Sequence, residues 1–439
     1  MDLPGELAVR NVFHILFSGI AFLAAFAVPW SADAQDLVVT RNVTVRANPL
    51  STSPRLHFPA IGERLVLLDD GRQERGYYHV RLGDGRVGWV YRTYVKRADE
   101  FALESADTAP SGPDQVKVHY IDVDQGNATL VEFPCAAILI DAGGRDPVAT
   151  GLLTRYLDSF FARRTDLQRR LAAVYVTHTH VDHNTALGAL VYNYKIGAYI
   201  DNGRLFGSGS KDAVWMAAYI RDVTPAMPRA AVLERDVRAS GGQGLAGPVI
   251  DPVACPGVDP QIRVLTGGRE RSDNSQWSKD DYDNGNNHSV VIRIDYGKAS
   301  FLFPGDLENA GIADALTRYA ETGLLDTDVV EVSHHGADNG TTAPFLAAIS
   351  PDIAVISMGP EGVRQDWSAY QYGHPRIASV RLLRDAVHLS RPAKHVRVAN
   401  AMRSFETMRM DKAVFGTGWD GTVIVTADAQ GRFAVKTEH

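Results

Sequence analysis

The sequence predicts an α/β protein with two folded units, a small all-β barrel followed by a large unit of mixed sheets covered by helices. The chain has 439 residues, 45% of them hydrophobic, which is more than one compact core usually supports. Short β-rich runs fill residues 36–97. From residue 115 to 439 strand-like and helix-like segments alternate. Residues 98–114, rich in Ala, Ser, Asp, Pro and Gly, are the expected linker between the two units.

Residues 1–34 are typical of a secretory signal peptide. Arg10 precedes an apolar run over residues 12–30, and the following Ala-Asp-Ala at 32–34 matches the cleavage pattern. We therefore expect a periplasmic or secreted protein that begins near Gln35. The alternative is an uncleaved membrane anchor, because the run approaches the ~20 residues that cross a bilayer. The mature chain has no later segment of that kind, which excludes a polytopic channel or transporter.

Charge and cysteine content limit the function further. The net charge is −7, and acidic and basic residues are interspersed, so the sequence shows no broad basic surface for gripping polyanions. The two cysteines are Cys135 and Cys255. They can pair in an oxidising compartment, but their separation along the chain says nothing about their proximity, so a disulfide remains open.

The predicted barrel has a hairpin signal at Asp84-Gly85, because Gly accepts the positive φ that such turns demand. Residues 42–49 and 85–90 resemble the "N-V-R-x-x-P" and "G-x-x-G-W-V" elements of bacterial Src-homology-3-type (SH3-like) barrels. The resemblance implies a targeting module with a possible cell-wall ligand. In the alternative, the aromatic residues pack only in the core and rim of the barrel; they are Tyr77, Tyr78, Trp89, Tyr91 and Tyr94.

The large domain opens with three closely connected strands and continues with an amphipathic helix. Apolar residues in 147–170 recur every three or four positions, and the arginines of this segment are interpreted as a solvated face. A buried strand then leads into the segment HTHVDH. Mixed sheets with helices outside fit the whole pattern. The other expected elements are strands at 116–123, 129–133, 136–144, 289–295, 299–304 and 329–333, and a helix at 309–322.

Half of the 14 histidines gather at four places in loops of the large domain. These are His178, His180 and His183; His288; His334 and His335; and His374. An extended chain projects His178 and His180 to the same side, where both reach one cation. Asp182 and His183 follow within one turn and reach a second. Nitrogen ligands combined with a carboxylate suit zinc, manganese or iron.

The alternative for any single histidine is a hydrogen-bonded core residue. Three histidines and an aspartate within the six residues 178–183 are too costly to bury without compensation, which favours metal binding. Two cations about 3.5–4 Å apart can share a water molecule and lower its pKa, which supplies a hydroxide for hydrolysis. We therefore expect two divalent metal ions, zinc or manganese.

The motif H-x-H-x-D-H resembles that of the metallo-β-lactamase superfamily. More narrowly, residues 116–435 look like the extracellular hydrolase domain of ComEC-type competence proteins. The matching segments are IDVDQGNATLV, ILIDAGG, VTHTHVDH, NNHSVVIRIDYGKASFLFPGDLE, EVSHHG, YGHP and VFGTGWDGTVIV. The resemblance implies the αββα sandwich of this superfamily and favours a phosphodiester substrate, either a small molecule or a nucleic acid.

The resemblance also implies roles for single residues. Asp306 would bridge the two metals, and His334 and His335 would be ligands. His374 would be a ligand or a proton donor to the leaving group, and Asp182 would serve both metal binding and catalysis. The alternatives are a β-lactam or lactone hydrolase, and a cell-wall-binding protein with an inactive hydrolase domain. Retention of the complete HTHVDH and of Asp306 argues against the inactive domain.

The chain departs from the family pattern at three places. The Gly-Gly after the histidine motif is replaced by residues 184–186, and the "G-Q-G-D" segment reads Asp-Gln-Gly-Asn at 124–127. Both changes affect the expected shape of the pocket. The third-motif histidine has no counterpart, since no histidine lies between His183 and His288. Either one metal binds weakly, or His288 takes the missing place.

Overall fold

The computed structural model describes residues 36–39, 43–59, 63–97, 110, 114–144, 146–272 and 276–439. The predicted signal peptide at 1–34 lies outside the described residues. So does the predicted linker at 98–114, apart from residues 110 and 114. Among the described residues, no helix combines the length and the apolar character that crossing a membrane requires.

Residues 36–97 form an antiparallel sheet, as predicted for a small all-β domain. The strand order is β3-β2-β7-β6-β4-β1-β8, with β5 beside β6. The predicted hairpin turn joins β6 to β7, and Gly85 has a φ of 85° there. Nine apolar side chains from this segment form a core of their own. The strands are β1 (Asp36–Val39), β2 (Val45–Arg46), β3 (Arg55–His57), β4 (Arg64–Leu67), β5 (Gln73–Glu74), β6 (Tyr77–Arg81), β7 (Val87–Tyr91) and β8 (Val95–Arg97).

The first sheet of the large domain has the order β16-β15-β13-β11-β10-β9-β25-β26. Neighbouring strands from β16 to β11 are parallel, and those from β11 to β26 are antiparallel. The sheet is therefore mixed, as the frequent hairpins predicted. Its strands are β9 (Gln115–Tyr120), β10 (Thr129–Glu132), β11 (Ala137–Ile140), β13 (Ala173–Tyr175), β15 (Tyr199–Asp201), β16 (Arg229–Ala231), β25 (Val423–Asp428) and β26 (Phe433–Thr437).

The second sheet has the order β17-β18-β19-β20-β21-β24. It is antiparallel from β17 to β19 and parallel from β19 to β24. Its strands are β17 (Gln261–Val264), β18 (Ile292–Tyr296), β19 (Ala299–Phe303), β20 (Val329–Glu331), β21 (Ile353–Ile356) and β24 (Val414–Gly416). Two small sheets pair β12 (Arg170–Leu171) with β14 (Lys195–Ile196), and β22 (Ser390–Ala401) with β23 (Ser404–Lys412).

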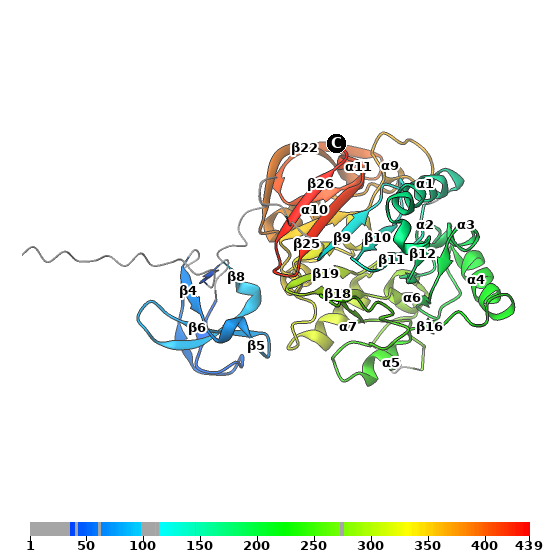
Figure 1. Ribbon diagram of the computed structural model, residues 1–439. Coiled ribbons are helices and arrows are strands. Elements are labelled where there is room, and N and C mark those ends of the chain that lie inside the picture. The colour runs from blue at the N-terminus through cyan, green and yellow to red at the C-terminus, as the bar shows by residue number, and fades with distance from the viewer. Residues whose placement is uncertain are drawn as a thin grey trace, which may run out of the picture. The chain divides into compact units, whose positions relative to one another are not determined.

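The two large sheets and the helices form an αββα sandwich, which confirms the predicted fold class (Figure 1). In β11, Ile138 and Ile140 pack in the core that contains the second sheet, whereas Ala137 and Leu139 pack toward α1. Helices α1 (Pro147–Arg163), α3 (Leu187–Asn193) and α4 (Ser210–Asp222) cover the first sheet. Helices α7 (Asn309–Tyr319), α8 (Ala343–Ile349) and α10 (Ile377–Ala386) pack with the second. The remaining helices are α2 (Val181–Asn184), α5 (Glu234–Ala239), α6 (Lys279–Asp283), α9 (Ala369–Tyr372) and α11 (Thr417–Asp420).

Helix α1 ends earlier than the apolar pattern suggested. Asp146 caps its first turn by accepting hydrogen bonds from two backbone amides, and the helix stops at Arg163. The next residue, Arg164, is not part of a solvated face as expected, because its side chain is only 18% exposed. Its guanidinium binds the carboxylate of Glu132 at 2.7 Å and the backbone oxygen of Pro134 at 2.8 Å. Arg164 therefore holds the turn between β10 and β11.

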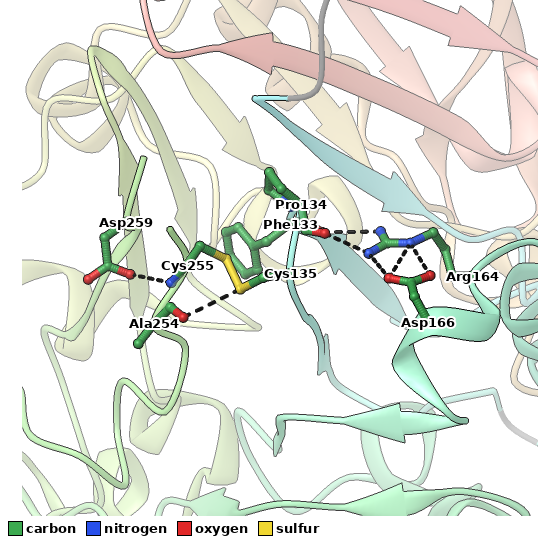
Figure 2. The surroundings of a disulfide bond; sticks show 8 residues. All are labelled: Phe133, Pro134, Cys135, Arg164, Asp166, Ala254, Cys255 and Asp259. Carbon is green, nitrogen blue, oxygen red and sulfur yellow. Dashed lines mark hydrogen bonds and ion pairs between the residues drawn. A yellow bond between two sulfur atoms is a disulfide. The ribbon is translucent and has the colours of Figure 1, made fainter. Parts of the chain in front are cut away.

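The same turn carries a disulfide bond between Cys135 and Cys255, whose Cα atoms are 5.5 Å apart (Figure 2). The bond joins the β10–β11 turn to the loop that precedes β17. Asp259 accepts a hydrogen bond from the backbone nitrogen of Cys255 at 2.8 Å, which orders that loop. The pairing that the sequence left open is thus present in the structure.

Candidate metal centre

The predicted site residues meet where loops leave the ends of three strands. The segment HTHVDH follows β13, Asp306 follows β19, and His334 and His335 follow β20. Backbone hydrogen bonds fasten the loops together. The nitrogen of Val290 donates to the oxygen of Thr177 at 2.9 Å. The sheets therefore present side chains from distant parts of the chain at one place.

Four of these residues form a compact cluster. The ligand atoms of Asp182, His183, Asp306 and His335 all lie within 4.8 Å of one another. Nε2 of His183 is 3.3 Å from Oδ1 of Asp306, and Nε2 of His335 is 3.5 Å from Oδ2 of Asp306. Nε2 of His335 is also 3.4 Å from Oδ2 of Asp182. Two imidazoles and two carboxylates thus face a common centre.

The donor atoms of this cluster fit a divalent metal ion. Nδ1 of His335 donates to the backbone oxygen of Ser357 at 2.6 Å, and Nδ1 of His183 contacts Oδ2 of Asp141 at 2.6 Å. Nε2 of each ring is buried and has no hydrogen-bond partner among the described residues. In metal-binding histidines, a hydrogen bond to one ring nitrogen commonly orients the ring, and the other nitrogen binds the metal. Here Nδ1 would be the orienting nitrogen and Nε2 the ligand. The cluster therefore suits a cation coordinated by nitrogen and oxygen.

Three more predicted site histidines, His178, His180 and His334, lie near this cluster. Nε2 of His178 is 3.1 Å from Nδ1 of His180 and 3.8 Å from Oδ2 of Asp306. Nε2 of His334 is 3.9 Å from the same oxygen of Asp306. Asn339 contacts Nδ1 of His334 at 2.9 Å. Asp306 is therefore within 4 Å of four histidines of the predicted site, His178, His183, His334 and His335.

His288 does not take the place of the missing third-motif histidine. Its Nδ1 accepts a hydrogen bond from the backbone nitrogen of Arg269 at 3.0 Å. Its Nε2 donates to the backbone oxygen of Tyr282 at 2.9 Å. Both ring nitrogens are thus engaged, and the ring is completely buried. The alternative that assigned His288 to the metal is therefore contradicted, because both of its ring nitrogens are already hydrogen-bonded to the backbone.

His374 lies beside the cluster and not within it. Its ring centroid is 5.6 Å from that of His334 and 6.2 Å from that of His335. Its Nδ1 is buried without a hydrogen-bond partner in the described part of the chain. Burial and the neighbouring histidines lower the pKa of His374 well below its ordinary value. This side chain therefore borders the candidate metal centre without belonging to the cluster.

The carboxylates and histidines of the cluster shift one another's pKa values. Burial disfavours the charged form of His183, yet Asp306 and Asp141 outweigh burial and raise its pKa well above the ordinary value. In the same way Asp306 and Asp182 raise the pKa of His335 to about 9 against the effect of burial. Burial alone would raise the pKa of Asp306, but the histidines hold it well below its usual range. The buried carboxylates thus favour positive charge at this place, and a divalent cation would supply it.

Asp141 is a site residue that the sequence analysis missed. It follows β11 and accepts hydrogen bonds from the backbone nitrogen of Thr177 at 2.7 Å and from the hydroxyl of Thr177 at 2.8 Å. Its contact with His183 sets the orientation of that ring. The available signal was a lone carboxylate near the end of the apolar segment ILIDAGG, which was assigned to a strand and matched to the superfamily without a role for Asp141.

A network of buried hydrogen bonds fixes the side chain of Asp141. The side-chain nitrogen of Asn127 donates to Asp141 and to Glu331, each at 3.1 Å. Glu331 also accepts hydrogen bonds from the hydroxyls of Thr129 and Ser357, each at 2.8 Å. Burial raises the pKa of Glu331. Asn127, one of the departures from the family pattern, therefore links Asp141 to Glu331 on β20.

Gly143 shows how closely the loops approach. A Cβ atom at this position would lie 1.6 Å from the backbone oxygen of Asp182. The backbone nitrogen of Asn127 donates to the same oxygen at 2.8 Å. Only glycine lets the segment after β11 approach the helical turn that carries Asp182 and His183.

Comparison with known proteins agrees with this geometry. Residues 121–359, more than half of the chain, match the sequence model of the metallo-beta-lactamase superfamily. "Recombination protein 2" of Haemophilus influenzae is 37% identical over 89 residues, which are 20% of this chain and 10% of that protein. "Competence protein ComA" of Neisseria gonorrhoeae is 31% identical over 99 residues, which are 23% of this chain and 14% of that protein. The chain thus spans only a small part of the length of these relatives.

Two solved structures are also similar. The metallo-beta-lactamase fold protein YhfI from Bacillus subtilis is 15% identical, with a TM-score of 0.32 over 55% of this chain and 85% of that one. A diphosphatase from the PhnP family is 10% identical, with a TM-score of 0.31 over 68% of this chain and 99% of that one.

Proposed function

This chain belongs to the metallo-beta-lactamase superfamily, whose members include hydrolases, and we propose that it hydrolyses phosphodiester bonds with the help of two divalent metal ions. The observation that carries the proposal is the cluster of Asp182, His183, Asp306 and His335, whose ligand atoms lie within 4.8 Å of one another. The relatives named for recombination and competence support a phosphodiester as the bond that is cleaved.

The proposed ligands divide into two sets that share Asp306. Asp182, His183 and His335 would hold one ion, and His178, His180 and His334 would hold the other. Mixed nitrogen and oxygen donors suit zinc or manganese. When bound, such ions lower the pKa of a water molecule and stabilise negative charge on a phosphoryl oxygen.

Residues of the chain would orient the metal-binding histidines and transfer a proton during hydrolysis. Asp141 and the backbone oxygen of Ser357 hold the Nδ1 atoms of His183 and His335, so that the Nε2 atoms face Asp306. We assign to His374 the transfer of a proton to the leaving oxygen, because its ring borders the cluster and its Nδ1 has no partner within the described residues.

The proposal includes export to the periplasm or the cell exterior. The Cys135–Cys255 disulfide supports it, because such bonds persist in oxidising compartments and are rare in the cytosol. The predicted signal peptide at 1–34 is consistent with this location. For residues 36–97 we propose a cell-wall ligand, which rests on the resemblance to SH3-like barrels.

Metal analysis of the purified protein tests the proposal, together with one assay for phosphodiester hydrolysis and one for β-lactam or lactone hydrolysis. The wild-type protein is expected to contain two zinc or manganese ions and to hydrolyse bis(p-nitrophenyl) phosphate, with activity lost to a chelator. Asp306→Ala should lose both the metal and the activity. Asp201→Ala is the matched control, since Asp201 is also buried at a strand end but pairs with Arg229.

Two results would overturn the proposal. Hydrolysis of a cephalosporin or lactone reporter without hydrolysis of the phosphodiester would establish the β-lactam or lactone alternative. A protein fully loaded with metal that hydrolyses neither, while the small domain binds cell wall, would establish a binding protein with an inactive hydrolase domain.

A further inference from the structure

The loop before β18 lies against two of the proposed metal ligands. Asn284 begins this loop, and its side-chain oxygen accepts a hydrogen bond from the backbone nitrogen of Asn286 at 3.1 Å. A Cβ atom at Gly285 would lie only 3.0 Å from Nε2 of His180. Nδ2 of Asn286 lies 3.4 Å from Nε2 of His334. The loop therefore brings one carboxamide to the edge of the candidate metal centre.

Asn286 is only 6% exposed, yet the fold uses only part of the hydrogen-bonding capacity of its side chain. Nδ2 donates to Oε1 of Glu308 at 2.6 Å, which identifies the nitrogen end of the amide, because a carboxylate only accepts hydrogen bonds. The second proton on Nδ2 has Nε2 of His334 as its acceptor. Oδ1 is buried and has no hydrogen-bond partner among the described residues. Buried amides are normally satisfied, so this side chain points to a ligand.

Glu308 holds this carboxamide in place. Its Oε2 accepts a hydrogen bond from Nδ2 of Asn284 at 2.8 Å, and its Oε1 accepts the one from Asn286. The same Oε1 lies 3.3 Å from Nδ1 of His334. Glu308 stands two residues after Asp306 in the loop that follows β19. One carboxylate therefore fixes Asn286 and His334 relative to each other.

The adjacent Asn287 shows how an asparagine with a purely structural role is used in this loop. It is 4% exposed, and both ends of its amide are engaged by the backbone. Nδ2 donates to the oxygen of Asp281 at 3.3 Å, and Oδ1 accepts from the nitrogen of Gly311 at 3.2 Å. Burial in the same loop thus does not by itself account for the unused oxygen of Asn286.

We infer that Asn286 donates a hydrogen bond from Nδ2 to a non-bridging oxygen of the substrate's phosphoryl group, and that Glu308 is its positioning residue. The inference rests on the proposed function and adds to it a residue that touches the substrate. When Nε2 of His334 ligates a metal ion, it can no longer accept a hydrogen bond from Nδ2. The second proton of Nδ2 is then available to an oxygen bound beside that histidine. A donor already held by the protein stabilises the negative charge that develops on this oxygen during hydrolysis.

Calorimetric titration of the metal-loaded, full-length protein with inorganic phosphate tests the inference, and the bound metal is measured on the same preparation. Asn286→Ala should retain the metal and bind phosphate roughly 10- to 100-fold more weakly, because it lacks a hydrogen bond to a charged group. Its rate of bis(p-nitrophenyl) phosphate hydrolysis should fall by about 10²-fold or more. Glu308→Gln should weaken phosphate binding as well. The double variant should bind phosphate no more weakly than Asn286→Ala, because Glu308 acts through Asn286.

Asn287→Ala is the matched control, because Asn287 is equally buried and its amide contacts only the backbone. It should lower the temperature of thermal unfolding and leave the phosphate affinity of the folded protein unchanged. Thermal unfolding should also show that Asn286→Ala remains folded.

Three results would overturn the inference. They are wild-type phosphate affinity in Asn286→Ala, loss of metal from that variant, which would make Asn286 a metal ligand, and a metal-loaded wild type that binds no phosphate. If wild type hydrolyses bis(p-nitrophenyl) phosphate and Asn286→Ala binds phosphate equally well, only the inference fails. If Asn286→Ala loses phosphate affinity but metal-loaded wild type hydrolyses no phosphodiester, only the proposed function fails.

Discussion

Nδ1 of His183 lies 2.6 Å from Oδ2 of Asp141, and both side chains are almost completely inaccessible to solvent. Asp141 is itself fixed by two hydrogen bonds from Thr177, the residue that precedes the histidine motif. One carboxylate therefore ties the end of β11 to the start of the motif and turns the Nε2 of His183 toward Asp306. In metal sites such a partner of the ligating histidine commonly sets the affinity for the metal.

We predict that Asp141→Asn weakens metal binding by about 10- to 100-fold, because the amide cannot stabilise the imidazole as a carboxylate does. Competition with a chromophoric chelator measures the affinity. Asp201→Asn serves as the control, since this buried carboxylate pairs with Arg229 and contacts none of the predicted ligands. Equal metal affinity of Asp141→Asn and wild type would show that Asp141 has only a structural role.

Much of the fold could be predicted from the sequence because apolar periodicity reports local structure directly. The strands before HTHVDH and before His334 are present where the pattern placed them, and α1 begins at Pro147 as predicted. The end of α1 was misjudged because Arg164 leaves the helix to bind the β10–β11 turn, a contact between segments that periodicity does not encode. The disulfide was undecidable for the same reason, since 120 residues separate its cysteines.

The candidate site was only partly predictable. HTHVDH is a local motif, so four of its side chains could be named from the sequence. The structure places His178 and His183 near Asp306, together with His334 and His335. Asp141 escaped notice because its partner lies 42 residues away. His288 was considered as a metal ligand because nothing in the sequence showed that its ring nitrogens have other partners. The hydrogen bonds that occupy its two nitrogens come from backbone groups that no sequence pattern identifies.

His374→Ala should separate proton transfer from metal binding. Because the ring borders the cluster at 5.6 Å from His334 without entering it, we expect the metal content to be largely kept. The rate of phosphodiester hydrolysis should fall by about 10² to 10⁴-fold, the usual contribution of a general acid or base. Metal analysis and steady-state kinetics on the same preparation provide the two readouts. Loss of metal in this variant would reassign His374 as a ligand.

The disulfide is expected to stabilise the large domain. Replacement of Cys135 and Cys255 together by serine should lower the free energy of unfolding by about 2–5 kcal/mol, because the bond closes a long loop in the unfolded chain. Urea unfolding of the wild type with and without a reducing agent measures the same effect independently. The double variant should be insensitive to the reducing agent. A wild-type protein whose stability does not change on reduction would contradict this role.

Glu132, at the end of β10, is a carboxylate outside the candidate metal centre whose ionisation should link stability to pH. Its oxygens contact the guanidinium of Arg164 at 2.7 Å and Nε2 of His119 at 3.2 Å. Burial would raise the pKa of Glu132, but the hydrogen bonds from His119 and Arg164 outweigh it and lower the pKa from 4.5 to about 2. The side chain is only 13% exposed, so solvent screens these contacts weakly.

A carboxyl group whose pKa is lower in the folded state stabilises the fold above its unfolded pKa and loses this contribution as the pH falls through the folded value. For Glu132 the loss should occur between about pH 4.5 and pH 2 and amount to roughly 3 kcal/mol. Glu132→Gln should therefore be less stable than wild type at pH 7, and the difference should shrink toward pH 2. Urea unfolding at several pH values measures it, with Glu406→Gln as the control because Glu406 on β23 is exposed. If the curves for Glu132→Gln and wild type stay parallel across this range, Glu132 does not control the acid stability of the fold.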